Sequence, residues 1–289
     1  MRHIGFMGKP FLSTSFTVIT ACVISSGEVI AADAEWLDVQ ASLPAVSAPN
    51  AKISGGGIFS EESLGVIEGS FSAPLTHSTG LQIDGLGGFG NGDGSFGVGA
   101  HVFWRDPGEG LIGVYGSYTS VDWGSADYEH LTIGIEGQAY LDTVSLEGIV
   151  GYEGGNNVES GVFGIFNVAV YPTEDLRLFA GLRHIQDNTF GALGVEYQFS
   201  GTLGDSGVSV FAEDRFDGDG DNQFWAGLRI HFGESKSLMR RHREDDPFNP
   251  TLDFLFEASV DDSMAAPTPS MEPTPPMEPT PPPTPSPVP

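Results

Sequence analysis

The chain has 289 residues, of which 39 are Asp or Glu and 12 are Lys or Arg, for a formal net charge of −27. This balance argues against nucleic acid and anionic lipid headgroups as partners, because proteins that bind phosphates gain affinity from Lys and Arg. Only 18% of residues are charged and 39% are hydrophobic, so the chain as a whole is not a solvated acidic tail. Its 40 Gly make up roughly 14% of the residues, about twice the ordinary usage.

Residues 1–31 have the features of a secretory signal peptide. Arg2 and Lys9 supply a charged start, and an apolar stretch follows in residues 11–24. About 14 apolar residues fall short of the ~20 that a membrane-spanning helix needs. Cys22 is the only cysteine, so the chain can form no internal disulfide. Cys22 is either removed with the signal, which we favour, or carries a lipid as the last residue of a lipobox-like ITAC sequence.

Four zones follow the signal peptide. Residues 32–50 are an Ala-, Pro- and Ser-rich lead-in, and residues 51–232 form a body rich in Gly and aromatic residues. Residues 233–263 hold a basic run followed at once by an acidic run, which neutralises it, so we expect a solvated, charged connector. Residues 264–289 include 12 Pro among 26 residues, and we expect a disordered tail in polyproline II conformation.

The body alternates between apolar and polar residues with a period of two, which is typical of β-strands. In residues 131–141 the odd positions, from Leu131 to Leu141, are apolar or small, whereas Glu136 and Gln138 stand among the even positions. Counting such segments between turn signals gives about twelve strands, and none shows a sustained helical period. The sequence therefore predicts an all-β body of antiparallel hairpins.

A soluble sandwich and an up-and-down transmembrane barrel both use such strands. Most of the predicted strands have ~10 residues, which is the length that crosses a bilayer at a tilt. The strand count is even, as in bacterial single-chain barrels, and the body holds a single Lys. Aromatic residues stand near the ends of apolar rows, as in interfacial girdles: Phe71, Phe89, Trp104, Tyr152, Phe199 and Phe232. We therefore predict a transmembrane β-barrel of about 12 strands.

The residues that face away from the apolar rows would line the lumen, and many are charged. The candidates for a selectivity lining are Glu68, Asp84, His101, Glu136, Glu147, Glu153, Arg177, Arg183, Glu196, Glu213, Arg229 and His231. An excess of carboxylates in a narrow pore favours cations. The alternative is a network of paired charges that fills the lumen, because buried charges require partners.

We expect no cofactor and no enzymatic activity. The histidines of the body do not form a serine–histidine–acid arrangement with any serine and acid that the sequence places beside them. Asp217, Asp219 and Asp221 resemble the first half of a calcium loop, but Leu228 stands where that loop needs a Glu. A flexible acidic hairpin turn is the favoured alternative to this weak calcium site.

The end of the body resembles the last-strand signal of Gram-negative outer-membrane proteins, with Gly227 followed by Ile230 and Phe232. Residues 47–50, 99–107 and 236–247 also resemble a group of poorly characterised, porin-like barrel proteins from alphaproteobacteria. The resemblance implies an outer-membrane location with both termini in the periplasm, and contacts with outer-membrane lipid and the barrel assembly machinery. The usual signal ends the chain, whereas residues 233–289 follow it here.

Three functions remain open. The preferred one is a narrow, porin-like diffusion channel for small cationic or neutral solutes. The second is a non-conducting structural barrel whose Pro-rich tail tethers the membrane to the envelope through a cell-wall or periplasmic partner. For the tail taken by itself, an inert disordered segment is the interpretation we favour. The weakest is a soluble secreted β-sandwich that binds a ligand.

Overall fold

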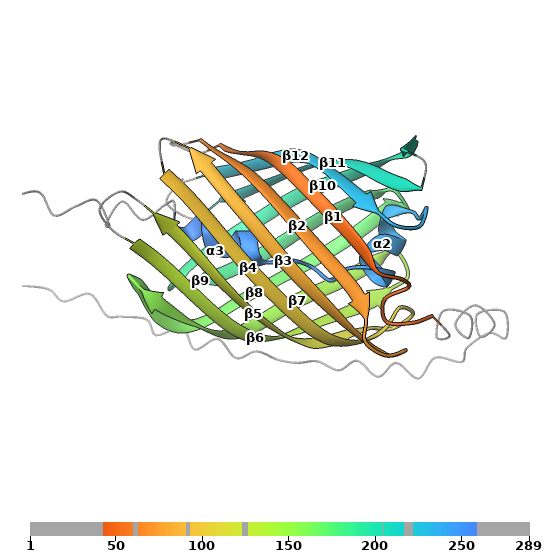
Figure 1. Cartoon of the computed structure of the whole chain (residues 1–289), viewed down its shortest axis with the longest axis horizontal. Helices are drawn as coiled ribbons and strands as arrows, with labels where there is room; N and C mark the ends of the chain where they lie inside the picture. Colours follow the sequence, from red (N-terminus) through yellow and green to blue (C-terminus); the bar gives the residue numbers. More distant parts are fainter. Residues whose placement is uncertain are drawn as a thin grey trace, which may run out of the picture.

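The structure, a computed structural model, describes residues 43–59, 63–90, 93–122, 127–203, 205–216 and 222–258. Twelve antiparallel strands form one closed sheet (Figure 1), in which each strand pairs with its neighbours in sequence and the first pairs with the last. The strands are β1 (Asn50–Phe59), β2 (Leu64–Pro74), β3 (Thr79–Gly90), β4 (Asp93–Asp106), β5 (Gly110–Asp122), β6 (Asp127–Leu141), β7 (Val144–Asn156), β8 (Val158–Thr173), β9 (Leu176–Ile185), β10 (Asn188–Leu203), β11 (Ser206–Phe216) and β12 (Asn222–Phe232). The predicted up-and-down barrel is therefore confirmed, and the two-sheet sandwich is excluded.

Several predicted features lie outside the described residues. They are the signal peptide of residues 1–31, most of the lead-in, the Pro-rich tail, and the acidic turn with Asp217, Asp219 and Asp221. Each of them stays a prediction.

The alternation in the sequence becomes an alternation between the two faces of the barrel wall. In β6, Leu131, Ile133 and Ile135 are 61%, 63% and 61% exposed, whereas His130 and Glu136 are almost completely buried. The same division between an apolar outer face and a polar inner face runs around the barrel. An outer face of large apolar side chains is what a barrel presents to lipid.

The aromatic residues predicted to form girdles all lie on the outer face and are exposed: Phe71, Phe89, Trp104, Tyr152, Phe199 and Phe232. Strand direction places them in two groups. Phe71, Trp104, Phe199 and Phe232 lie toward the end of the barrel at which β1 begins, and Phe89 and Tyr152 lie toward the opposite end. Aromatic rings near both rims are typical of transmembrane barrels.

The two ends of the barrel are distinguished by the chain. We call the end at which β1 begins and β12 finishes the entry end. We call the opposite end, which carries the connection from β1 to β2 and the equivalent connections around the rim, the far end. Residues 43–49 cover part of the entry end, where the Ala45 amide donates to the His77 carbonyl at 2.7 Å and Val46 packs against Phe103. At the far end, Gln186 and Asp187 both have positive φ angles, as in a type I′ hairpin turn.

Beyond β12 the chain turns back into the barrel. Helix α2 (Leu238–Glu244) lies at the entry end, and helix α3 (Thr251–Ala258) lies within the barrel (Figure 1). We call residues 236–255 the lumenal segment. Within the described ranges, neither helix has the length and hydropathy of a membrane span.

The lumenal segment differs from the solvated connector expected for residues 233–263. Arg241, Glu244, Asp245 and Asp246 are each less than 5% exposed. The reason is electrostatic: the inner wall supplies partners of opposite charge, such as Lys52 for Asp246, so these side chains are buried as pairs.

Candidate functional site

The inner wall holds all twelve residues that were predicted to line the lumen. Ten of them are buried, and the side chains of Glu213 and Arg229 are 14% and 16% exposed. The placement agrees with the alternation of each strand. Their role in selectivity stays a prediction, and their contacts divide them into four groups.

The first group is a chain of side chains across neighbouring strands. The Nε2 atom of His101 lies 2.9 Å from Asp84 Oδ2, and its Nδ1 atom lies 2.9 Å from Glu136 Oε2. Only the doubly protonated ring can donate to both carboxylates. Gln82 donates from Nε2 to Asp84 Oδ1 at 2.9 Å. All four side chains are buried, and their contacts join β3, β4 and β6.

The second group lies near the far end. The Nε2 atom of His130 lies 2.8 Å from Glu153 Oε2, and the Gln186 amide donates to Glu153 Oε1 at 2.7 Å. Glu153 therefore holds the β9–β10 turn to β7. His130 was not among the predicted lining residues, although it has the same position in the alternation as Glu136.

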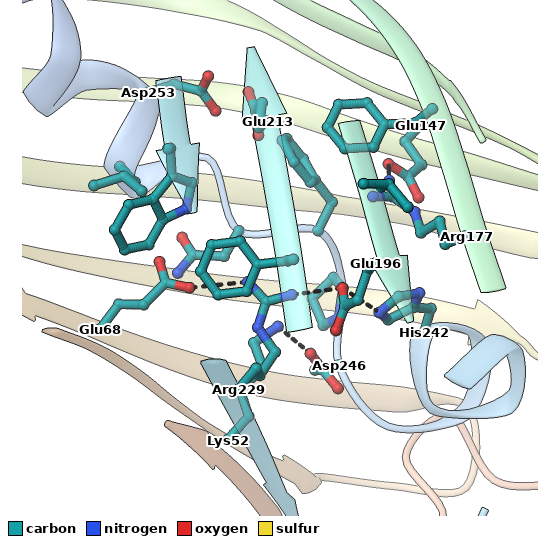
Figure 2. A pocket seen from close by; sticks show the side chains of 18 of the residues that line it. Lys52, Glu68, Glu147, Arg177, Glu196, Glu213, Arg229, His242, Asp246 and Asp253 are labelled. Atoms are coloured by element: carbon teal, nitrogen blue, oxygen red, sulfur yellow. Dashed lines mark hydrogen bonds and ion pairs between the residues drawn. The ribbon is translucent and has the colours of Figure 1, made fainter. Parts of the chain in front are cut away.

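The third group surrounds an internal cavity (Figure 2). Arg229 donates from Nη1 to Glu196 at 2.7 Å and from Nη2 to Glu68 at 3.1 Å. Across the cavity, Arg177 donates to Glu147 Oε2 at 2.8 Å. His231 lies 3.4 Å from Glu196, on the same strand as Arg229. Each arginine of this group thus neutralises one or two carboxylates.

The fourth group joins the wall to the lumenal segment. Asp253 Oδ1 accepts from Arg183 Nε at 2.8 Å and lies 2.9 Å from Arg215 Nη2. Arg215 also donates from Nε to Glu213 at 2.8 Å, and Arg183 from Nη1 to Asn167 at 2.7 Å. Asp253 is therefore a carboxylate from α3 placed between two arginines of the wall.

Apolar contacts hold α3 in place beside these charges. The ring of Phe254 is fully buried and lies 5.2 Å from the ring of Phe163, edge to face, and 5.1 Å from that of His130. Thr251 Oγ1 lies 3.0 Å from the hydroxyl of Tyr115. The inner wall thus provides α3 with both a buried apolar contact surface and hydrogen-bond partners.

The cavity has a volume of about 100 Å³ and lies between the wall and the lumenal segment. Charged side chains of both signs line it, including Glu68, Glu147, Arg177 and Arg229 from the wall and Asp246 from the segment (Figure 2). The lumenal segment therefore forms one side of this cavity.

Sequence reasoning missed several inner-wall residues besides His130. Lys52, Arg105 and Arg215 all face inward. Arg105 lies over the ring of Phe103 at 4.7 Å and donates to the Ala45 carbonyl at 3.0 Å. The alternation around Ile53 would have found Lys52, and its extension to the last residues of β4 and β11 would have found Arg105 and Arg215. The inward position of Asp246 and Asp253 has no comparable signal, because they lie outside the strands.

The predicted assembly signal lies on the strand that closes the barrel. Gly227 pairs with Gly56 of β1, and a Cβ atom at Gly227 would collide with the backbone of β1, so the closure requires glycine here. Phe232 faces outward at the entry end. Recognition of Gly227, Ile230 and Phe232 by the assembly machinery stays a prediction.

Within the described ranges, no three His, Cys, Asp or Glu side chains are arranged to hold a metal ion. The weak calcium candidate is among the residues that the structure does not describe.

No family model matches the chain, and no curated protein matches it. Among solved structures, the chain is similar to KdgM porin, with a TM-score of 0.47 and 10% identity over 63% of this chain and 99% of that one. It is similar to the translocator domain of the autotransporter NalP from Neisseria meningitidis, with a TM-score of 0.47 and 12% identity over 70% and 95% of the two chains. A third is Salmonella typhi OmpF in complex with daunomycin, with a TM-score of 0.35 and 10% identity over 64% and 97%. The resemblance to an alphaproteobacterial group stays a prediction.

Proposed function

We propose that the protein is a β-barrel of a Gram-negative outer membrane that works as a narrow diffusion channel for small cationic or neutral solutes. The observation that carries the proposal is the contrast between the two faces of one closed wall. The outer face exposes apolar residues with aromatic rings toward both rims, and the inner face is lined with charged and polar side chains. A barrel with these faces suits lipid outside and water inside.

The lumenal segment is the proposed restriction of this channel. It occupies the lumen through contacts of Asp246, Thr251, Asp253 and Phe254 with the wall. We propose that the conformation described here conducts weakly and that displacement of the segment gives a second, more open state. The balance between the two states then depends on the contacts that hold the segment.

Selectivity would come from the wall around the cavity. Here Glu68, Glu147 and Glu196 are paired with Arg177 or Arg229, so the preference for cations is expected to be modest. Replacement of Arg177 would remove the cationic partner of Glu147 and strengthen that preference.

The test is the conductance and reversal potential of the full chain in a planar bilayer under a KCl gradient. Arg177→Gln should shift the reversal potential toward greater cation selectivity, because Glu147 loses its partner. Asp214→Asn is the control, since Asp214 lies on the outward side of β11. A channel whose reversal potential is the same in all three chains would contradict the proposed lining.

A second candidate function is a non-conducting structural barrel with a tethering tail. The observation in its favour is that each predicted lining carboxylate has a cationic or histidine partner, so the lumen is already neutralised and filled. Absence of conductance under all conditions, including those that displace the lumenal segment, would favour this candidate.

The barrel itself can be tested separately from conduction. A membrane barrel is expected to migrate differently on a denaturing gel before and after boiling, because its closed sheet resists detergent until heated. By the usual orientation of barrels with an even strand count, we propose that the entry end faces the periplasm and the far end faces outside.

A further inference from the structure

The direction in which the lumenal segment runs through the barrel determines the end at which the chain leaves it. At the entry end, the Met239 amide donates to the carbonyl of Glu174, in the β8–β9 turn, at 2.9 Å. Arg243 donates from Nη2 to the carbonyl of Val144, beside the β6–β7 turn, at 3.1 Å. Both turns lie on the rim where β12 finishes, so the segment starts at that rim.

The middle of the segment lies deeper in the lumen. Thr251 contacts the hydroxyl of Tyr115, which stands in the middle of β5. A Cβ atom built on Gly99, in the middle of β4, would lie 2.5 Å from Thr251 Oγ1. By residue 251 the chain has therefore reached the centre of the wall.

The last described side chains of the segment lie toward the far end. Leu252 and Leu255 belong to one buried cluster with Ile58, Tyr128 and Trp225. Ile58 is next to the last residue of β1, Tyr128 is the second residue of β6, and Trp225 is the fourth of β12. All three positions are near the rim opposite the one at which the segment enters. The segment therefore crosses the barrel from one end to the other.

We propose that the barrel is also the conduit through which its own C-terminal chain crosses the membrane. The 31 residues after Ala258 (289 minus 258), which include the Pro-rich residues 264–289, would then leave at the far end. This places the tail on the opposite side of the membrane from residues 43–49, whereas the sequence alone suggested that both termini share one side. The proposal rests on the membrane location in the proposed function and is independent of conduction.

Charge and packing favour a crossing chain over a chain that folds back. Asp246 pairs with Lys52 near the entry end, and Asp253 pairs with Arg183 and Arg215 nearer the far end, so successive acids of the segment meet successive cations of the wall. The fully buried ring of Phe254 fixes the register between them. A chain that returned to the entry end would have to pass the same filled lumen a second time.

The experiment compares three single cysteines in intact cells. Ser263→Cys reports the tail, Ser160→Cys reports the far end beside the β7–β8 turn, and Thr143→Cys reports the entry end in the β6–β7 turn; Ser160 and Thr143 are both exposed. The natural sequence has Cys22 only, so the unmodified chain is the blank. The probe is a maleimide on a polymer too large to pass a porin, added before and after permeabilisation of the outer membrane.

The proposal predicts that Ser263→Cys and Ser160→Cys share one accessibility and that Thr143→Cys has the other. With the entry end in the periplasm, the first two react in intact cells and the third reacts only after permeabilisation. The proposal would be overturned if Ser263→Cys had the same accessibility to the maleimide as Thr143→Cys. It would also be overturned if all three cysteines were labelled equally. A reversed orientation would exchange the compartments and leave the grouping unchanged. If the cysteines label as predicted but the barrel shows no conductance, the diffusion-channel function is rejected and the crossing of the C-terminal chain is retained.

Discussion

The two halves of the lumenal segment are held in different ways. Residues 236–246, at the entry end, bind through charged and backbone groups: Lys52 pairs with Asp246, Arg241 donates to Gln198 at 2.9 Å, and Gln198 donates from Nε2 to the Lys236 carbonyl at 2.8 Å. Residues 251–255 bind largely through a buried apolar surface around Phe254, with Asp253 as the charged contact.

The difference follows from the position of each half in the chain. The entry half is joined to β12 by a few residues, so it stays at high effective concentration beside its partners even when a contact is lost. The far half is joined to β12 only through the entry half, so its position in the middle of the lumen depends on its own contacts with the wall. We therefore expect changes in the far half to open the lumen and changes in the entry half to have little effect.

The largest effect is expected for Phe254→Ala. Removal of a buried phenyl ring typically destabilises a structure by about 3–5 kcal/mol. Here it destabilises only the state in which α3 is bound to the inner wall. The variant should show a higher single-channel conductance or open probability than the unmodified chain.

Phe166→Ala is the matched control for this change. Phe166 lies on the outer face of β8 and is 46% exposed, so its loss should leave the conductance unaltered. Equal conductance of Phe254→Ala and the unmodified chain would contradict the role of the far half.

A smaller opening is expected for Asp253→Asn. The change removes the carboxylate that Arg183 and Arg215 share, and loss of one partner from a buried ion pair can cost about 3 kcal/mol or more. Asparagine retains one acceptor oxygen, so the effect should be below that of Phe254→Ala. The measurement is the same bilayer recording, with Asp214→Asn as the outward-facing control. An Asp253→Asn channel that stays as closed as the control would argue against this anchor.

Thr251→Val should have a modest effect. It removes the hydroxyl that lies 3.0 Å from the Tyr115 hydroxyl and keeps the side-chain volume. A single hydrogen bond of this kind contributes about 0.5–1.5 kcal/mol. We expect up to about a tenfold rise in open probability, since about 1.4 kcal/mol corresponds to a factor of ten. A rise in open probability as large as that for Phe254→Ala would show that the apolar contacts of Phe254 are not the main interaction that holds the far half.

The smallest effect is expected in the entry half, for Arg240→Ala. The Arg240 side chain is 48% exposed, and its ion pair with Glu244, at 2.7 Å, links two residues of α2 itself. Glu244 is buried but keeps Lys236 as a cationic partner at 3.2 Å, so the loss should be close to that of an exposed pair, about 0–1 kcal/mol. Conductance and heat-dependent mobility should match those of the unmodified chain. A clear opening by Arg240→Ala would remove the distinction between the two halves.

The wall of this protein is largely predictable from its sequence, and the occupant of the lumen is not. Alternation alone places Glu136 and Arg183 inside and Ile133 and Leu182 outside, because a side chain on a strand can point to only one of the two faces of the sheet. Extending that alternation to the strand ends would also have found Arg105.

The lumenal segment has no such constraint. A basic run followed by an acidic run has the composition of a solvated connector, and its burial depends on partners that are distant in sequence. Lys52 and Asp246 are 194 residues apart, and Arg183 and Asp253 are 70 apart. One local signal was present: Leu252, Phe254 and Leu255 supply apolar residues that a solvated connector does not need.

The most direct test of the account is a reversible covalent link between the wall and α3. The 2.5 Å between Thr251 Oγ1 and a Cβ built on Gly99 places a cysteine pair at these positions near the Cβ–Cβ separation of a disulfide, about 3.5–4.5 Å. The chain to record carries Gly99→Cys, Thr251→Cys and Phe254→Ala together.

In the oxidised chain we predict a disulfide between positions 99 and 251 and a low conductance, despite the loss of Phe254. Reduction in the same bilayer should raise the conductance to at least that of Phe254→Ala alone, because the reduced chain also lacks the Thr251 hydroxyl. Failure of the disulfide to form in the membrane-inserted barrel, or a conductance that is indifferent to reduction, would contradict a lumenal segment that restricts this channel.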